Sequence, residues 1–238
     1  INLAGKSIFT RWTRDAKKKI RDSRVLTTRN LAEALSTTKN AVLISTSAVG
    51  YYGDRGEDVL TESEPPGDDF LARVGADWER EARRAESNSV RVVLARFGIV
   101  LGRGGGAMGT MLPAFRWFLG GRLGSGDQWF PWIHIDDLVD AYRFMIARSD
   151  VAGPVNLCAP QPVRNRHLTQ TLARTLGRPA ILPVPEPVVR LVLGEFGESL
   201  LASIRAIPAG LHDAGFVFAF SDLGPALAEI VKKPVDRK

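Results

Sequence analysis

Apolar and polar positions along this chain predict parallel strands separated by helices. Residues 41–44 form a continuous apolar run, and the hydroxyl side chains of Ser45, Thr46 and Ser47 follow it directly. A short run of this kind is typical of a central parallel strand buried on both faces. Ligands bind beyond the carboxyl ends of such strands, so the hydroxyls indicate a site of polar chemistry. The alternative is that these small residues let the strand end pack against a helix.

The same pattern places further elements on both sides of this strand. A roughly helical apolar spacing predicts a long helix over 13–35, with Thr13 or Asp15 as its N-cap. Asp68 or Asp69 is expected to cap the next helix. The other expected elements are strands at 1–5, 90–96 and 155–159, and helices at 70–85, 110–119, 164–176, 187–204 and from 223 onward.

Composition is that of a globular protein with material for a sizeable core. The chain has 238 residues, 45% of them hydrophobic, and no apolar run long enough to span a bilayer. Its first residues do not form a signal peptide. Cys158 is the only cysteine, so an intrachain disulfide is excluded, and its apolar neighbours predict a core position. We therefore expect a cytoplasmic protein with no membrane partner, present as a monomer or homodimer.

The net charge of +6 raises the question of nucleic-acid binding. The basic residues gather only at 17–24 and 232–238, and no zinc pattern or aromatic–basic interleaving accompanies them. We therefore expect no nucleic-acid partner. His134 lies beside Asp136 and Asp137, but this spacing does not form a convincing metal site. A structural role is expected for His134, with the two aspartates as N-cap and first-turn residue of a helix, and no metal is predicted.

Two motifs carry a resemblance to a known family. They are S-T-S-A-V-G-Y-Y-G at 45–53 and L-G-S-G-D-Q-W-F-P-W-I-H-I-D-D at 123–137. Both resemble segments of the extended short-chain dehydrogenase/reductases, the nicotinamide-dependent epimerase and dehydratase group. The order of motifs, from Ile1 to about Val231, is similar to that of the "epimerase family" branch with a short C-terminal domain.

The resemblance implies an α/β fold with a Rossmann-like parallel sheet over 1–179 and a small, mostly helical substrate-side domain over 180–238. It implies NADP as the cofactor, with NAD as the second choice. The positions that match the family's cofactor-binding segments are Asn2, Leu3, Ala4, Gly5, Thr46, Phe97, Gly98 and Ile99. No Gly-rich strand–turn–helix fingerprint opens the chain, so the first strands of the Rossmann sheet are expected to be missing through truncation.

The family's catalytic residues match only in part. Ser47 matches the catalytic serine, but the positions of the tyrosine and lysine pair carry Leu71 and Gly75, which cannot transfer a proton. Tyr51 and Tyr52 on the adjacent turn are the obvious substitutes. Tyr52 matches a tyrosine that is chiefly a pocket wall in the family, and as a base it would need a nearby positive charge. Ser47 and Tyr52 are the predicted catalytic residues.

Two functions follow from these observations. The first is a nicotinamide-dependent oxidoreductase or epimerase that acts on a small carbonyl or sugar-nucleotide-like substrate with the help of Ser47. The second is a non-catalytic dinucleotide-binding sensor or partner protein. The absent Tyr–Lys pair favours the second function, and the retained serine turn favours the first.

Overall fold

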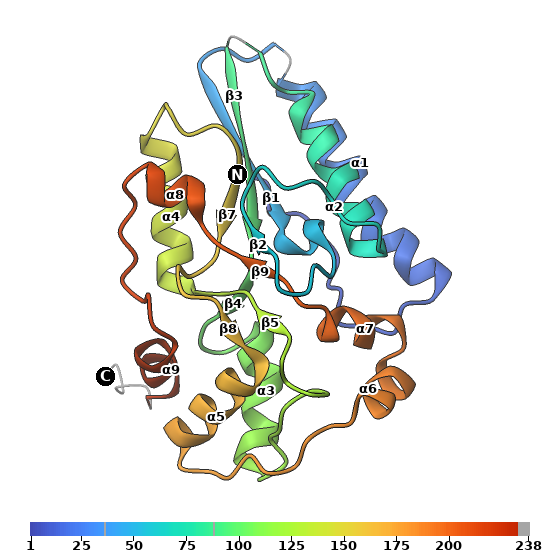
Figure 1. The fold of residues 1–238 in the computed structure, drawn as a ribbon. Helices are drawn as coiled ribbons and strands as arrows, with labels where there is room; N and C mark the ends of the chain where they lie inside the picture. Colours follow the sequence, from blue (N-terminus) through green and yellow to red (C-terminus); the bar gives the residue numbers. More distant parts are fainter. Residues whose placement is uncertain (36, 88, 233–238) are drawn as a thin grey trace, which may run out of the picture.

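A three-stranded parallel sheet forms the centre of the fold in the computed structural model, which describes residues 1–35, 37–87 and 89–232. Its order is β1 (Ala41–Ala48), β3 (Val90–Phe97) and β7 (Gly153–Leu157), with the first strand in sequence at one edge (Figure 1). Asn2 makes a parallel bridge to Ser45, so the start of the chain lies along the outer side of β1. The predicted α/β class with a parallel sheet is confirmed.

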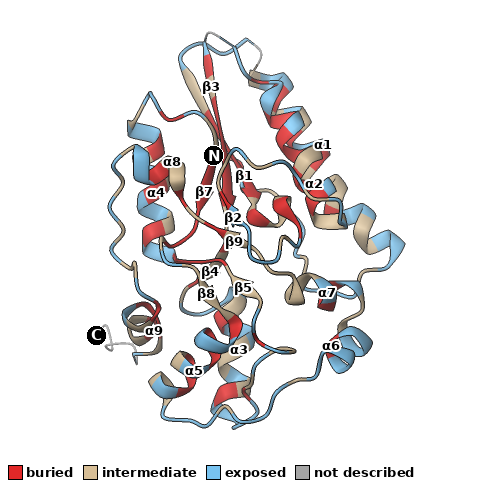
Figure 2. Ribbon diagram, in the orientation of Figure 1, coloured by how far each residue is buried: buried red, intermediate tan, exposed pale blue. Residues whose placement is uncertain are grey.

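Helices cover both faces of this sheet. Side chains alternate between the faces along each strand. Leu43 and Leu94 therefore pack toward α1 (Arg14–Leu35) and α2 (Phe70–Arg83), while Ile44 and Val93 pack toward α4 (Ile135–Ala147) and α8 (Ala209–Asp213). The strands are the most continuously buried part of the molecule (Figure 2). Burial on both faces explains the apolar runs in their sequences.

A second core lies below the sheet in the view of Figure 1 and is built around Trp132. The elements that contribute to it include α3 (Gly106–Arg116), α5 (Asn165–Leu176) and α9 (Leu223–Val231). Short strand pairs join it to the sheet. They are β4 (Ile99–Leu101) with β6 (Trp132–His134), and β5 (Trp129–Phe130) with β8 (Val163–Arg164).

The segment after residue 180 packs into both cores. Its strand β9 (Arg205–Ala206) pairs with β2 (Val59–Leu60), and its helix α9 packs on α5. The helices α6 (Glu186–Leu193) and α7 (Glu195–Leu201) come before β9 in this segment. The division at 179/180 stays a prediction.

Several local signals act as predicted. Asp69 caps α2, accepting a hydrogen bond from the Ala72 amide at 2.8 Å, and Gly177 ends α5 in the left-handed conformation with φ 61°. Thr13 accepts a hydrogen bond from the Ala16 amide at the start of α1. Cys158 is a buried core residue, as predicted.

Three predicted helices differ in detail. Residues 187–204 form two helices rather than one, because Gly194 adopts φ 60° between α6 and α7. The helix expected at 110–119 begins at Gly106 and ends at Arg116. The N-cap of α4 is His134, whose Nδ1 accepts from the Asp136 amide at 3.2 Å, so both aspartates lie in the first turn.

Candidate functional site

The carboxyl ends of neighbouring strands meet beside the start of the chain. Ser47 of β1 pairs with Arg96 of β3, and the Thr46 amide donates to the Asn2 carbonyl at 3.0 Å. Six of the predicted cofactor residues are gathered at this edge: Asn2, Leu3, Ala4, Gly5, Thr46 and Phe97. The structure therefore brings together segments that are far apart in the sequence.

Residues 2–5 combine a fixed side chain with an accessible backbone. The side-chain amide of Asn2 is buried and donates to the hydroxyls of Thr28, at 2.7 Å, and Ser45, at 3.3 Å. Leu3 is 68% exposed, and Gly5 is exposed beside the guanidinium of Arg24. A Cβ at Gly5 would lie 3.0 Å from Arg24 Cζ, so glycine leaves room between this backbone and a positive charge.

Thr46 points to the α4 side of the sheet, away from Ser47. Its hydroxyl is 2.8 Å from the hydroxyl of Tyr142 on α4. Burial raises the pKa of Tyr142, and the hydrogen bond with Thr46 opposes this shift. Sequence reasoning missed Tyr142, because no local pattern connects a helix position with a strand end 96 residues earlier.

Gly98 and Ile99 leave the sheet toward the second core. A Cβ at Gly98 would lie 2.8 Å from the carbonyl oxygen of Pro131, and the Ile99 amide donates to that same oxygen at 2.7 Å. Phe97 packs with the core beneath α4, and Ile99 packs with the core around Trp132. These contacts are structural, and the cofactor contacts of Phe97, Gly98 and Ile99 stay predictions.

Ser47 is directed into the protein. Its hydroxyl donates to Glu79 Oε1 at 2.7 Å, and the residue is 1% exposed. Glu79 belongs to α2, on the face that packs against β1. The hydroxyl proton of Ser47 is therefore held by a carboxylate of the core.

Glu79 is in turn held by Arg96 in a buried ion pair. Arg96 Nε lies 2.7 Å from Glu79 Oε1, and Arg96 Nη2 lies 2.7 Å from Glu79 Oε2. Burial alone would lower the pKa of Arg96, but the hydrogen bonds and charge of Glu79 outweigh it, so the pKa lies above its ordinary value. This bidentate geometry fixes both side chains in one arrangement.

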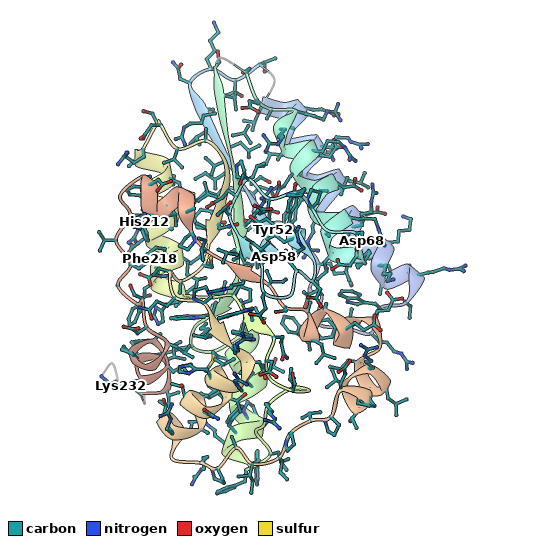
Figure 3. All side chains as sticks on the ribbon, in the orientation of Figure 1. Tyr52, Asp58, Asp68, His212, Phe218 and Lys232 are labelled. Atoms are coloured by element: carbon teal, nitrogen blue, oxygen red, sulfur yellow. The ribbon has the colours of Figure 1, made fainter. Side chains whose placement is uncertain are left out.

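Tyr52 closes the same network on its other side. It is fully buried and lies near the centre of the molecule (Figure 3). Its hydroxyl donates to Asn156 Oδ1 at 2.7 Å and accepts from Arg96 Nη1 at 3.0 Å. Burial raises the pKa of Tyr52 to about 12, although Arg96 opposes the shift. A phenol with this pKa is a poor proton donor or acceptor at neutral pH. The catalytic roles of Ser47 and Tyr52 stay predictions.

The positions of the missing Tyr–Lys pair lie on the face of α2 beside this network. A Cβ at Gly75 would lie 3.4 Å from Cα and Cβ of Tyr51, so the tyrosine packs where a side chain at 75 would begin. The guanidinium of Arg96 stacks on the ring of the same tyrosine, with its Cζ 3.6 Å from the Tyr51 ring centroid. Tyr51 thus fills the space beside Gly75, and only Leu71 borders an open cavity.

That cavity has a volume of about 490 Å³ and lies between α2 and the α6–α7 pair. Its apolar wall includes Trp12, Phe70 and Leu71. Its carboxylates are Asp54, Asp69, Glu186, Glu195 and Glu198, against a single lining arginine, Arg190. Glu186 pairs with Arg190 at 2.6 Å, Glu195 pairs with Lys17 behind the wall, and Asp69 uses one oxygen to cap α2. The cavity is therefore apolar on one side and acidic on the other.

A second cavity, of about 340 Å³, has basic walls. It is lined by Trp129, Arg164, Arg166 and His167 among others. The guanidinium groups of Arg164 and Arg205 lie 4.4 and 4.5 Å from the Trp129 ring centroid. The basic residues Arg164, Arg166 and His167 are close together in the sequence, in β8 and the start of α5, but local spacing did not connect them with Trp129.

His134 has the structural surroundings that were expected of it. It is fully buried, Nε2 lies 3.3 Å from Glu229 Oε2, and its ring lies against Phe220. Asp137 accepts hydrogen bonds from the amides of Ala219, at 2.7 Å, and Phe220, at 3.0 Å. Within 1–35, 37–87 and 89–232, no three His, Cys, Asp or Glu side chains form a metal-binding group.

Comparison with known families agrees with this architecture. The profile described as the NAD dependent epimerase/dehydratase family matches residues 1–158, and a domain of unknown function, DUF1731, matches residues 184–230. The chain belongs to the NAD dependent epimerase/dehydratase family. The predicted branch, with its short C-terminal domain, is confirmed.

Individual relatives cover nearly the whole chain. Epimerase family protein Mb2239 of Mycobacterium bovis is 43% identical over 98% of this chain and 78% of its own length. The chloroplastic homologue of epimerase family protein SDR39U1 from Arabidopsis thaliana is 40% identical over 98% and 68%. The crystal structure of human SDR39U1 (isoform 2) with NADPH superposes with a TM-score of 0.92 at 39% identity, over 96% of this chain and 80% of that one.

Proposed function

We propose that the protein binds NADP(H) at the carboxyl end of β1 and residues 2–5, and a small polar ligand in the 490 Å³ cavity. In this proposal it is a dinucleotide-dependent binding protein that works without the Tyr–Lys proton relay. Ser47 and Tyr52 then hold the site together rather than transfer protons. The observation that carries the proposal is the closed hydrogen-bond network of Ser47, Glu79, Arg96 and Tyr52, in which every hydroxyl has a buried partner.

The residues at the strand ends fit a dinucleotide in two respects. The backbone at Gly5 is accessible, and Arg24 places a guanidinium beside it, suited to a phosphate oxygen. Burial lowers the pKa of Arg24, but from so high an ordinary value that the group remains charged at neutral pH. The structure of a relative with NADPH supports the choice of NADP over NAD. When bound, a nicotinamide supplies or accepts a hydride.

The first test is calorimetry with NADPH and NADH. It is run on this chain and on a form extended upstream by a Gly-rich strand–turn–helix. We expect the extended form to bind NADPH more tightly than NADH. The Ser47→Ala variant of the extended form is expected to bind NADPH as tightly as the form with Ser47. If neither form binds either nucleotide, the dinucleotide proposal is wrong.

A second candidate function is an oxidoreductase or epimerase that acts on a small carbonyl or sugar-nucleotide-like substrate. The observation in its favour is that Leu71, at the family's tyrosine position, borders the cavity together with Asp54 and Asp69. A carboxyl group in the cavity can replace a phenol as the proton donor. Proton transfer would then come from the cavity wall and not from Ser47 or Tyr52.

The Asp69→Asn variant separates the two functions. Asparagine is as good an N-cap as aspartate, so α2 keeps its start while the carboxyl group is lost. NADPH oxidation is followed by absorbance with aldehydes and ketones. Epimerisation of UDP-sugars is followed by chromatography of the sugar product, because it leaves no net change in the nucleotide. The second function is established if the protein turns over one of these substrates, if Asp69→Asn reduces that turnover at least tenfold, and if Tyr52→Phe leaves it unchanged. No turnover with any of these substrates, alongside intact NADPH binding, favours the first.

A further inference from the structure

One end of the molecule exposes an unusual number of large apolar side chains. We call it the apolar rim; it consists of Trp117, Phe118, Leu119, Ile181 and Leu182. The most exposed are Ile181, at 78%, Trp117, at 76%, and Leu119, at 64%. Single exposed apolar residues need no explanation, but a contiguous group of this size marks an interaction surface.

The rim comes from two loops that contact each other, one at 117–119 and one at 181–182. The guanidinium of Arg178 lies 4.7 Å from the Phe118 ring centroid, and the Val184 amide donates to the Arg122 carbonyl at 2.9 Å. The chain then passes directly into α6, whose buried side chain is Val189. The loop from α5 to α6 follows the lower end of the molecule, beside the end of α3, and this end is largely exposed (Figures 1 and 2).

The two loops of the rim carry positive charge and contain no acidic residue. Residues 87–126 and 151–185 contain no aspartate or glutamate, although they include α3, α5 and both rim loops. Arg116, Arg122 and Arg178 are exposed there, and none has a carboxylate partner in the described part of the chain. Glu186, at the start of α6, is paired with Arg190. The rim is therefore an apolar strip with unpaired arginines at its border.

We propose that the apolar rim binds the surface of an anionic lipid bilayer. Apolar side chains that enter the headgroup region beside arginines that meet lipid phosphates are the features of interfacial binding. Side chains exposed by three quarters or more project from the surface and do not line a groove, so they suit a layer that deforms around them. No helix in the described ranges is long and apolar enough to cross a membrane, and this mode of binding needs none. The proposal therefore departs from the expectation of no membrane partner, which rested on the lack of a spanning segment.

A second copy of the chain is a poorer occupant of the rim. A symmetric contact centred on the rim would bring Arg116, Arg122 and Arg178 of both copies into one interface, to which the two rim loops contribute no carboxylate. Such like charges, brought together, oppose association. The charge of the rim thus points to an anionic surface, independently of the dinucleotide and ligand sites.

The test is co-sedimentation with vesicles of equal parts phosphatidylcholine and phosphatidylglycerol, compared with phosphatidylcholine alone. We expect binding to the anionic vesicles only, weakening as salt is added. The double variant Trp117→Ser, Ile181→Ser removes two projecting side chains and is expected to lower the partition coefficient at least tenfold. Its matched control is Val217→Ser, which changes an apolar residue that is 85% exposed elsewhere.

Charge is tested with two double variants of identical net charge. Arg116→Glu with Arg122→Glu alters the rim, whereas Arg80→Glu with Arg143→Glu alters α2 and α4. The rim pair is expected to lose at least tenfold in binding, and the control pair about threefold or less. Equal losses would mean non-specific attraction to a basic protein and would overturn the proposal. So would a failure to bind anionic vesicles, or a rim-dependent dimer in sedimentation velocity that binds no vesicles.

Discussion

The start and the middle of α2 differ: the first turn borders an open cavity, and two turns further on the helix belongs to a closed polar network. Leu71 lies in the first turn beside the 490 Å³ cavity. Glu79 belongs to the buried Ser47–Glu79–Arg96–Tyr52 network, to which the turn η1 (Val49–Tyr52) contributes Tyr52. In the network the titratable groups are paired with one another and shielded from water. In the cavity the carboxylates stand at an open wall. The contrast teaches that the motif with the strongest family signal supports the fold, while the space available to a ligand lies beside it.

The largest expected effect comes from Glu79→Gln. The change leaves the charge of Arg96 buried without a counter-ion, so the free energy of unfolding should fall by about 3–5 kcal/mol. Urea denaturation measures it. The matched control is Glu81→Gln, two residues further along α2, whose partners Arg29 and Arg84 are about half exposed. That change should lower the free energy of unfolding by about 1 kcal/mol or less, and equal effects would contradict the description of the network as closed.

Tyr52→Phe is expected to have the next largest effect. It leaves Asn156 Oδ1 and one N–H of Arg96 without this partner in the core, which should lower the free energy of unfolding by about 1–3 kcal/mol. Calorimetric NADPH affinity should stay the same within error. A variant that is as stable as the wild type but has lost NADPH binding or turnover would show that Tyr52 belongs to the chemistry.

Gly194→Ala tests the wall of the cavity. Gly194 has φ 60° and ψ −141°, a conformation that favours glycine, and it separates α6 from α7. Alanine there should lower the free energy of unfolding by about 1–2 kcal/mol and shift the packing of α6 and α7 around the cavity. Gly224→Ala, at a position with open space around it, is the control and should be neutral or slightly stabilising. Thermal unfolding of the two variants makes the comparison.

The smallest expected effect concerns how the free energy of unfolding changes at acidic pH. Hydrogen bonds from Arg29, opposed by burial, lower the pKa of Glu81 to about 2 from an ordinary value of 4.5. Because the folded-state pKa is the lower one, the stabilisation is fully present above pH 4.5 and is lost as the pH falls toward 2. Glu81→Gln should therefore flatten the dependence of stability on pH in this window. An unchanged slope would mean that the pair adds nothing in solution.

Much of the fold follows from local sequence. The apolar run before Ser45 predicted the buried strand β1, Asp69 and Gly177 predicted helix ends, and the two motifs predicted the family. The failures share one cause. Gly194 divides a continuous apolar pattern, because the chain bends at this residue between α6 and α7. His134, not Asp136, is the cap of α4, because its ring nitrogen accepts the hydrogen bond from the Asp136 amide. Neither is visible in local spacing.

The candidate site was predictable in position but not in arrangement. Ser47 was identified as a polar residue at a strand end, and its place beside Arg96 follows from parallel pairing. Its hydrogen bond to Glu79 depends on how α2 lies against β1, and the bond from Tyr52 to Asn156 joins residues 104 positions apart. Side-chain partners at such separations are set by packing, which no window of sequence contains.

The sequence by itself determined the α/β class, the family and the edge of the sheet at which polar side chains gather, because periodicity and motifs are properties of neighbouring residues. Only the tertiary structure decided which of those side chains are paired in the core and which face the cavity. It also brought Trp117 and Ile181 onto one exposed rim. The physical reason is that pairing, burial and surface patches depend on distances in space between segments far apart in the chain.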